Sequence, residues 1–157
     1  MNTYLKNIQV LGGENMSYHV KKDRLIKALK DAGLYQIFNI SDENDFVLFQ
    51  TEQSIKNGRC LISTALDDRI YNSIHFFLGN LGNPGKKQKM LDLMNDLNKD
   101  GLMIKYYLDE DDAIMARITY IVPNEEFDGD FFVNLMTLSY NIISNDHYPQ
   151  IMRLIWS

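Results

Sequence analysis

The chain has 157 residues, of which 45% are hydrophobic and 24% are charged. This composition is typical of a folded globular protein and excludes an intrinsically disordered chain. The length fits a single domain with one hydrophobic core. The formal net charge of −5 repels phosphate groups, so it disfavours nucleic acid and an anionic membrane as partners.

Cys60 is the only cysteine, which excludes an intramolecular disulfide and a two-cysteine redox or zinc site. The first residues contain no apolar stretch of signal-peptide length. No later segment approaches the about eighteen consecutive apolar residues of a membrane span. We therefore expect a cytoplasmic protein.

The beginning of the chain gives a mixed pattern, so residues 1–16 are predicted to be a loosely held extension. Residues 17–157 are predicted to form one α+β domain. Its first helix is expected to begin at a Ser17 cap and to end at Gly33, which provides a left-handed stop. The basic side chains of this helix are predicted to form a solvated face: Lys21, Lys22, Arg24, Lys27 and Lys30.

Four runs rich in β-branched and aromatic residues follow, and they predict strands at about 35–40, 46–53, 59–66 and 69–78. Their links are short, so consecutive strands must be antiparallel and form a meander. Asn57-Gly58 is the strongest hairpin signal among these links.

The second half predicts a helix over about 86–98 and then a hairpin from "LMIKYYL" and "AIMARITYIV". A long helix is expected from about residue 125 or 130 to residue 144. Tyr148-Pro149 is predicted to break the chain before a short terminal helix. The predicted fold is therefore α+β, with an antiparallel sheet made of a meander plus a hairpin and about three helices.

Residues 96–107 begin like a calcium-binding EF-hand loop, because Asp96, Asn98 and Asp100 alternate and Gly101 follows. The twelfth position is Tyr107, which cannot supply the bidentate carboxylate that the loop requires. The segment after Gly101 alternates like a strand, whereas an EF-hand continues into a helix. We expect no metal site here and a left-handed Gly101 at the end of the preceding helix.

No other fragment completes a catalytic motif. "GNLGNPGKKQ" lies between a strand and a helix, but Asn80 and Lys87 replace the glycine and the hydroxyl of a phosphate-binding loop. There is no G-x-S-x-G motif, and Cys60 lies in an apolar strand run, where we expect a buried structural thiol. The sequence predicts no catalytic residue, metal or cofactor, although carboxylates from separate strands could still converge in three dimensions.

The strand "DFVLFQT" is apolar on both of its alternating sides, which is unusual for an antiparallel sheet with one side in water. The second side is expected to be covered by a homodimer partner, by a bound peptide, or by helices of the same chain. Apolar residues near the end of the chain give a second candidate surface. The predicted partner-binding residues are Val47, Phe49, Met152, Ile155 and Trp156.

Three segments within residues 90–156 carry a family resemblance: "MLDLMNDLNKDG", the hairpin "YYLDEDDAIMARITYIV" and "FFVNLMTLSYNIISNDHYPQIMRLIW". They resemble the YbjN-domain family of bacterial proteins, described as sensory transduction regulators. The resemblance implies a fold similar to type III secretion chaperones, which commonly dimerise and hold an extended segment of a client protein. It implies no cofactor and no catalytic chemistry, and fold alone does not establish function.

Three functional hypotheses follow from these observations. The first is a non-enzymatic protein-binding module, chaperone-like or regulatory, that acts as a dimer. The second is a small enzyme or ligand-binding protein with a site of dispersed acidic and aromatic residues. The third is an inhibitor or immunity protein that uses its acidic surface against a basic partner.

Overall fold

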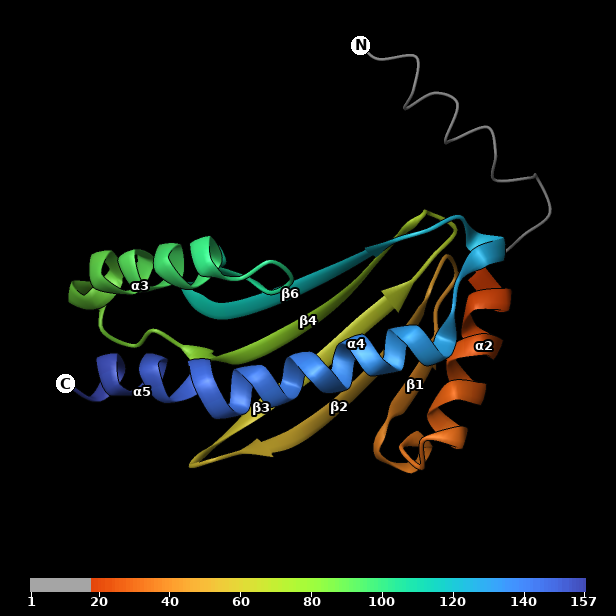
Figure 1. Cartoon of the computed structure of the whole chain (residues 1–157), viewed down its shortest axis with the longest axis horizontal. Helices are drawn as coiled ribbons and strands as arrows, with labels where there is room; N and C mark the ends of the chain where they lie inside the picture. The colour runs from red at the N-terminus through yellow and green to blue at the C-terminus, as the bar shows by residue number, and fades with distance from the viewer. Residues whose placement is uncertain (1–17) are drawn as a thin grey trace, which may run out of the picture.

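The computed structural model describes residues 18–157, so the predicted extension 1–16 and the Ser17 cap lie outside the described residues. The described residues form an antiparallel six-stranded sheet in the order β1-β2-β3-β4-β6-β5, together with helices (Figure 1). The predicted α+β class, with a meander followed by a hairpin, is confirmed. The strands are β1 (Asn39–Asp42), β2 (Val47–Ile55), β3 (Gly58–Leu66), β4 (Tyr71–Asn80), β5 (Lys105–Leu108) and β6 (Ala113–Ile121).

The helices are α2 (Tyr18–Asp31), α3 (Lys87–Asp100), α4 (Gly129–Ile142) and α5 (Tyr148–Trp156). Three short helical turns accompany them, η1 (Tyr35–Ile37), η2 (Pro84–Lys86) and η3 (Asn124–Glu126). A π-helical turn, η4 (Ile143–His147), joins α4 directly to α5. The sequence predicted a break at Tyr148-Pro149, but the chain stays helical there. Pro149 lies in the first turn of α5, where its missing N–H is not needed.

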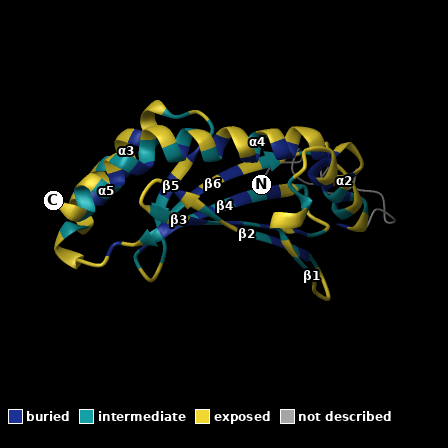
Figure 2. Cartoon of the chain, turned by 90° about the horizontal axis from the view of Figure 1, so that it is seen from below, coloured by how far each residue is buried: buried dark blue, intermediate teal, exposed yellow. Residues whose placement is uncertain are grey.

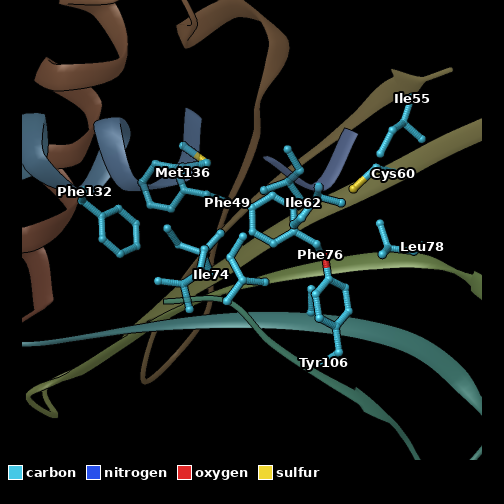
Figure 3. Close-up of a cluster of buried hydrophobic side chains, with 14 of the residues drawn as sticks. Phe49, Ile55, Cys60, Ile62, Ile74, Phe76, Leu78, Tyr106, Phe132 and Met136 are labelled. Carbon is cyan, nitrogen blue, oxygen red and sulfur yellow. The ribbon is translucent and has the colours of Figure 1, made fainter. Parts of the chain in front are cut away.

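The helices of residues 18–157 lie on one side of the sheet (Figure 2). The strands alternate accordingly: Val47 and Phe49 of β2 are fully buried, whereas Leu48 between them is half-buried on the opposite side. Figure 3 shows Phe49, Ile62 and Phe76 of the sheet pointing to the same interior as Phe132 and Met136 of α4. The core is thus a single layer between sheet and helices, and the other side of the sheet, named the open face below, carries no described helix.

The predicted basic face of α2 needs a correction at Lys21. Its side chain is fully buried, and its Nζ donates hydrogen bonds to the Arg69 carbonyl (2.7 Å) and to Asn72 Oδ1 (2.9 Å). The reason is its position, because Lys21 shares a helical stripe with buried Tyr18 and Leu25. Gly33, with φ of 71°, ends the helix in the left-handed conformation as predicted.

Two predicted strand details also change. The run 35–40 begins as the helical turn η1 and becomes a strand only at Asn39. The β2–β3 turn consists of Lys56 and Asn57, one residue earlier than expected, and Lys56 has a positive φ of 43°. Gly58 is already paired with Ile55, and a Cβ at Gly58 would overlap the Tyr148 hydroxyl. Glycine leaves room there for the close approach of Tyr148 of α5.

Candidate protein-binding surfaces

The thiol of Cys60 is fully buried in β3, which confirms the predicted structural cysteine. Burial raises the pKa of the Cys60 thiol to about 12, so the thiol stays protonated near neutral pH. A nucleophilic cysteine needs the opposite environment, accessible and with a lowered pKa. Cys60 therefore serves packing.

The histidines lie on separate elements, at His19 in α2, His75 in β4 and His147 in η4. Tyr106 Oη and His147 Nδ1 are hydrogen-bonded at 2.8 Å, and burial lowers the pKa of His147, which favours a neutral ring. Burial, and secondarily the neighbouring Arg117, lowers the pKa of His75. Residues 18–157 contain no group of three or more His, Cys, Asp or Glu side chains that could hold a metal ion.

The segment with the calcium-like spacing ends α3 at Asp100 and leads into a strand as predicted, but β5 begins only at Lys105, after a loop at 101–104. The sequence predicted a left-handed Gly101, and this prediction is wrong, because its φ of −89° and ψ of 130° are extended. Glycine is still required, because a Cβ at Gly101 would lie 2.9 Å from the Leu97 carbonyl oxygen. Asn98 binds the backbone of β5: its Nδ2 donates to the Tyr106 carbonyl (2.9 Å), and its Oδ1 accepts from the Tyr106 N–H (2.6 Å).

Carboxylates of the acidic turn between β5 and β6 form hydrogen bonds within the turn and an ion pair with α3. Asp109 Oδ1 accepts from the N–H groups of Asp111 (2.9 Å) and Ala113 (2.8 Å). Lys87 forms an ion pair with Asp112 at 2.7 Å. These carboxylates fold the turn and anchor it to α3.

The first candidate surface is the open face. Strand register places four large side chains side by side across it, since Leu61 pairs with Phe77, Phe77 with Met115, and Met115 with Tyr107. All four are half-buried, and directly opposed residues point to the same side of a sheet. Leu61, Phe77, Met115 and Tyr107, named the apolar row, thus run across β3, β4, β6 and β5.

A second row lies beside the apolar row, two residues along each strand. His75 of β4 pairs with Arg117 of β6, which pairs with Lys105 of β5. His75, Arg117 and Lys105 are named the basic row. The Arg117 guanidinium lies 5.6 Å from the centre of the Tyr107 ring, and no carboxylate of residues 18–157 forms an ion pair with it. The open face is therefore apolar with a positively charged neighbour, although the whole chain is acidic.

The second candidate surface is a groove of about 560 Å³ on the helical side, between the end of α3, the loop 101–104 and the η4 turn. Its apolar lining includes Leu97, Leu102, Ile104 and Ile142. Its charged lining consists of Asp96, Asp100 and Asp146. Leu102 is 98% exposed, which is unusual for a large apolar side chain at the lip of an apolar hollow. This set of residues is named the groove.

The structure separates the residues that the sequence predicted to bind a partner. Val47 and Phe49 are fully buried in the core and are not at the surface, since the helices cover their side of β2. Met152 and Ile155 of α5 are half-buried, and Trp156 is 82% exposed. Sequence reasoning missed the apolar row and the groove, because each depends on contacts between elements that are distant in sequence.

No helix within residues 18–157 is long and apolar enough to cross a membrane. Comparison with models of protein families and with curated proteins found no match. The resemblance to the YbjN-domain family stays a prediction.

Proposed function

We propose that the protein is a non-enzymatic protein-binding module, chaperone-like or regulatory, and that its open face binds a segment of another protein that carries apolar and acidic side chains. The observation that carries this proposal is the apolar row across four strands on the side of the sheet without a described helix. Grouped apolar side chains of this kind are typical of interaction sites.

The size of the open face suits a protein partner. Six strands at a spacing of about 4.8 Å are about 24 Å wide, and nine-residue strands such as β2 and β3 are about 30 Å long. Such a face is of the same order as the about 800 Å² that each partner contributes to a standard interface. A small metabolite would leave most of the apolar row exposed.

The basic row specifies the charge of the partner. Within residues 18–157 Arg117 has no carboxylate partner, and Lys105 Nζ donates to the carbonyls of Asn98 (2.9 Å) and Gly101 (2.8 Å) at the end of α3. Acidic side chains of a partner would complement this row, whereas a second copy would place the same basic row against it. An acidic and apolar segment of another protein is therefore favoured over self-association.

The partner is expected to bind on the face of the sheet, because β5 is covered at Tyr106 by the Asn98 side chain and β1 is short. Asn98 satisfies the outward N–H and carbonyl of Tyr106 on β5, so an added strand has no free partner there. At the other edge β1 has only four residues and is attached to α2 by the Lys22–Asp42 ion pair (2.7 Å). A strand added at β5 would have to displace the Asn98 contacts.

Selection from a random peptide display library against the full-length chain tests this proposal. We expect the enriched peptides to combine aromatic or aliphatic residues with Asp or Glu. Their affinity should fall by about tenfold in a Leu61→Asn/Arg117→Glu variant, because both rows lose a contact. The matched control is Leu91→Asn/Lys89→Glu, which makes the same kinds of change on exposed positions of α3.

Equal affinity for the wild type and the Leu61→Asn/Arg117→Glu variant would contradict the proposal, as would a selection that enriches no peptide. Sedimentation velocity over a range of protein concentrations measures self-association in parallel. A dimer that disappears in the same variant would assign the open face to a second copy instead of to an acidic partner.

A further inference from the structure

We propose that the groove is a second, separate interaction surface, and that it binds a basic amphipathic segment of another protein. The apolar side chains of that segment would enter the groove, and its lysine or arginine side chains would lie against Asp96, Asp100 and Asp146. The inference does not depend on the open face, because the groove lies on the opposite, helical side of the sheet and shares no residue with either row.

The apolar part of the groove is built by three elements that meet there. Leu97 comes from α3, Leu102 and Ile104 from the loop before β5, and Ile142 from the end of α4. Leu97 and Ile104 are buried, Ile142 is half-buried, and Leu102 stands at the lip almost completely exposed. A partner that covered Leu102 would remove a large apolar side chain from water, which favours binding.

The charge of the lining specifies the partner. Three lining residues are carboxylates, Asp96, Asp100 and Asp146, and no lysine or arginine of the described part of the chain lines the groove. None of these three carboxylates makes an ion pair or a side-chain hydrogen bond within residues 18–157. Their charges are therefore available to a cationic partner, and the net charge of −5 would favour the approach of one.

The shape of the groove is fixed by an irregular helix. The η4 turn widens the helical run between α4 and α5, and it places Asp146 and His147 at the groove. The hydrogen bond between His147 Nδ1 and the Tyr106 hydroxyl (2.8 Å) attaches this turn to β5. A π-helical turn inside an α-helix is frequently found at a functional site. The groove is thus held open by the backbone of η4 and the Tyr106–His147 contact.

The test uses a short fluorescein-labelled peptide that places leucines on one face of a helix and lysines on the other face. A matched peptide has glutamate in place of lysine. Fluorescence anisotropy with the full-length chain should show saturable binding of the lysine peptide and none of the glutamate peptide. Asp96→Asn/Asp100→Asn should raise the Kd of the lysine peptide by about threefold to tenfold. Leu102→Asn should raise it separately while leaving the unfolding midpoint unchanged, since that side chain is solvated.

Two controls separate the groove from the general acidity of the chain. Asp45→Asn/Asp111→Asn removes the same charge at exposed positions outside the groove, and it should leave the Kd nearly unchanged. Leu61→Asn on the open face should also have no effect. The proposal is overturned if the Asp45/Asp111 variant weakens binding as much as the Asp96/Asp100 variant, because binding would then follow net charge alone. It is equally overturned if the glutamate peptide binds as tightly as the lysine peptide.

Discussion

Lys21 is buried, which its residue type does not predict. A lysine is expected at the surface, yet this one is fully buried and bonded to the Arg69 carbonyl and to Asn72. Burial lowers the pKa of Lys21 to about 8, although the nearby Asp67 and Asp68 oppose the shift. Only its place between Tyr18 and Leu25 on one helical stripe could have indicated this burial from the sequence.

The lowered pKa of Lys21 gives a pH dependence with a definite sign. Between pH of about 8 and 10 the unfolded chain, with an ordinary lysine pKa of about 10.4, binds more protons than the folded chain. The free energy of unfolding contributed by Lys21 must therefore rise with pH, by at most about 1.4 kcal/mol per pH unit. We expect this free energy to rise more steeply in the wild type than in Lys21→Met when both are measured by urea unfolding.

The comparison with Lys21→Met is needed because Cys60 acts in the opposite direction. Its thiol has a pKa raised to about 12, so the folded chain keeps that proton after the unfolded chain has lost it, and stability falls above pH of about 8.5. This contribution is common to both proteins and is removed by subtraction. Parallel pH profiles for the two proteins would show that Lys21 keeps an ordinary pKa in the folded state.

At the scale of elements, α3 and β5 are joined by a side chain that imitates a neighbouring strand. Asn98 donates to and accepts from the backbone of Tyr106, which leaves no free hydrogen-bonding group at that point of the edge. An exposed edge invites pairing with other chains, so this contact also protects the sheet from association at β5. The sequence showed Asn98 only as a fragment of a false calcium loop.

We predict that Asn98→Ala lowers the free energy of unfolding by about 1–3 kcal/mol, since two hydrogen bonds to the Tyr106 backbone of β5 are lost. The amide of Tyr106 should exchange with solvent faster, which hydrogen exchange followed by NMR can measure residue by residue. Asn95→Ala on the exposed side of the same helix is the control and should change neither quantity. Unchanged exchange at Tyr106 in Asn98→Ala would refute the assigned contact.

At the scale of the whole molecule, the α4–α5 run packs against the β2–β3 hairpin. Tyr148 at the start of α5 packs directly against Gly58, and the Tyr140 hydroxyl of α4 donates to the Ser54 carbonyl of β2. These contacts join segments that are distant in sequence and hold the α4–α5 run across the sheet (Figure 1). The same packing leaves the opposite side of the sheet without a described helix.

Gly58→Ala tests the contact between α5 and the β2–β3 hairpin, because its added methyl group would overlap the Tyr148 hydroxyl. We expect the free energy of unfolding to fall by about 1–3 kcal/mol, as in other overpacked sites. Tyr148→Phe removes the overlapping oxygen, so the Gly58→Ala substitution should be much less destabilising in that background. A double-mutant cycle measured by thermal unfolding gives this coupling, and strictly additive effects would mean that the two residues do not meet.

The sequence by itself determined the class and order of the elements. Periodicity and turn residues are local, so the amphipathic helix ending at Gly33, the meander and the acidic hairpin could be predicted. Local pattern also placed Cys60 correctly in the interior.

Only the tertiary structure decided which side of the sheet is open and which residues share a surface. Val47 and Leu48 are both apolar, and their roles differ solely because the helices pack on the Val47 side. The apolar row exists only through the pairing of four strands, and the groove only through the meeting of α3, the loop 101–104 and η4. Such long-range packing is not encoded in any local period, so the two proposed binding surfaces could not be predicted from the sequence.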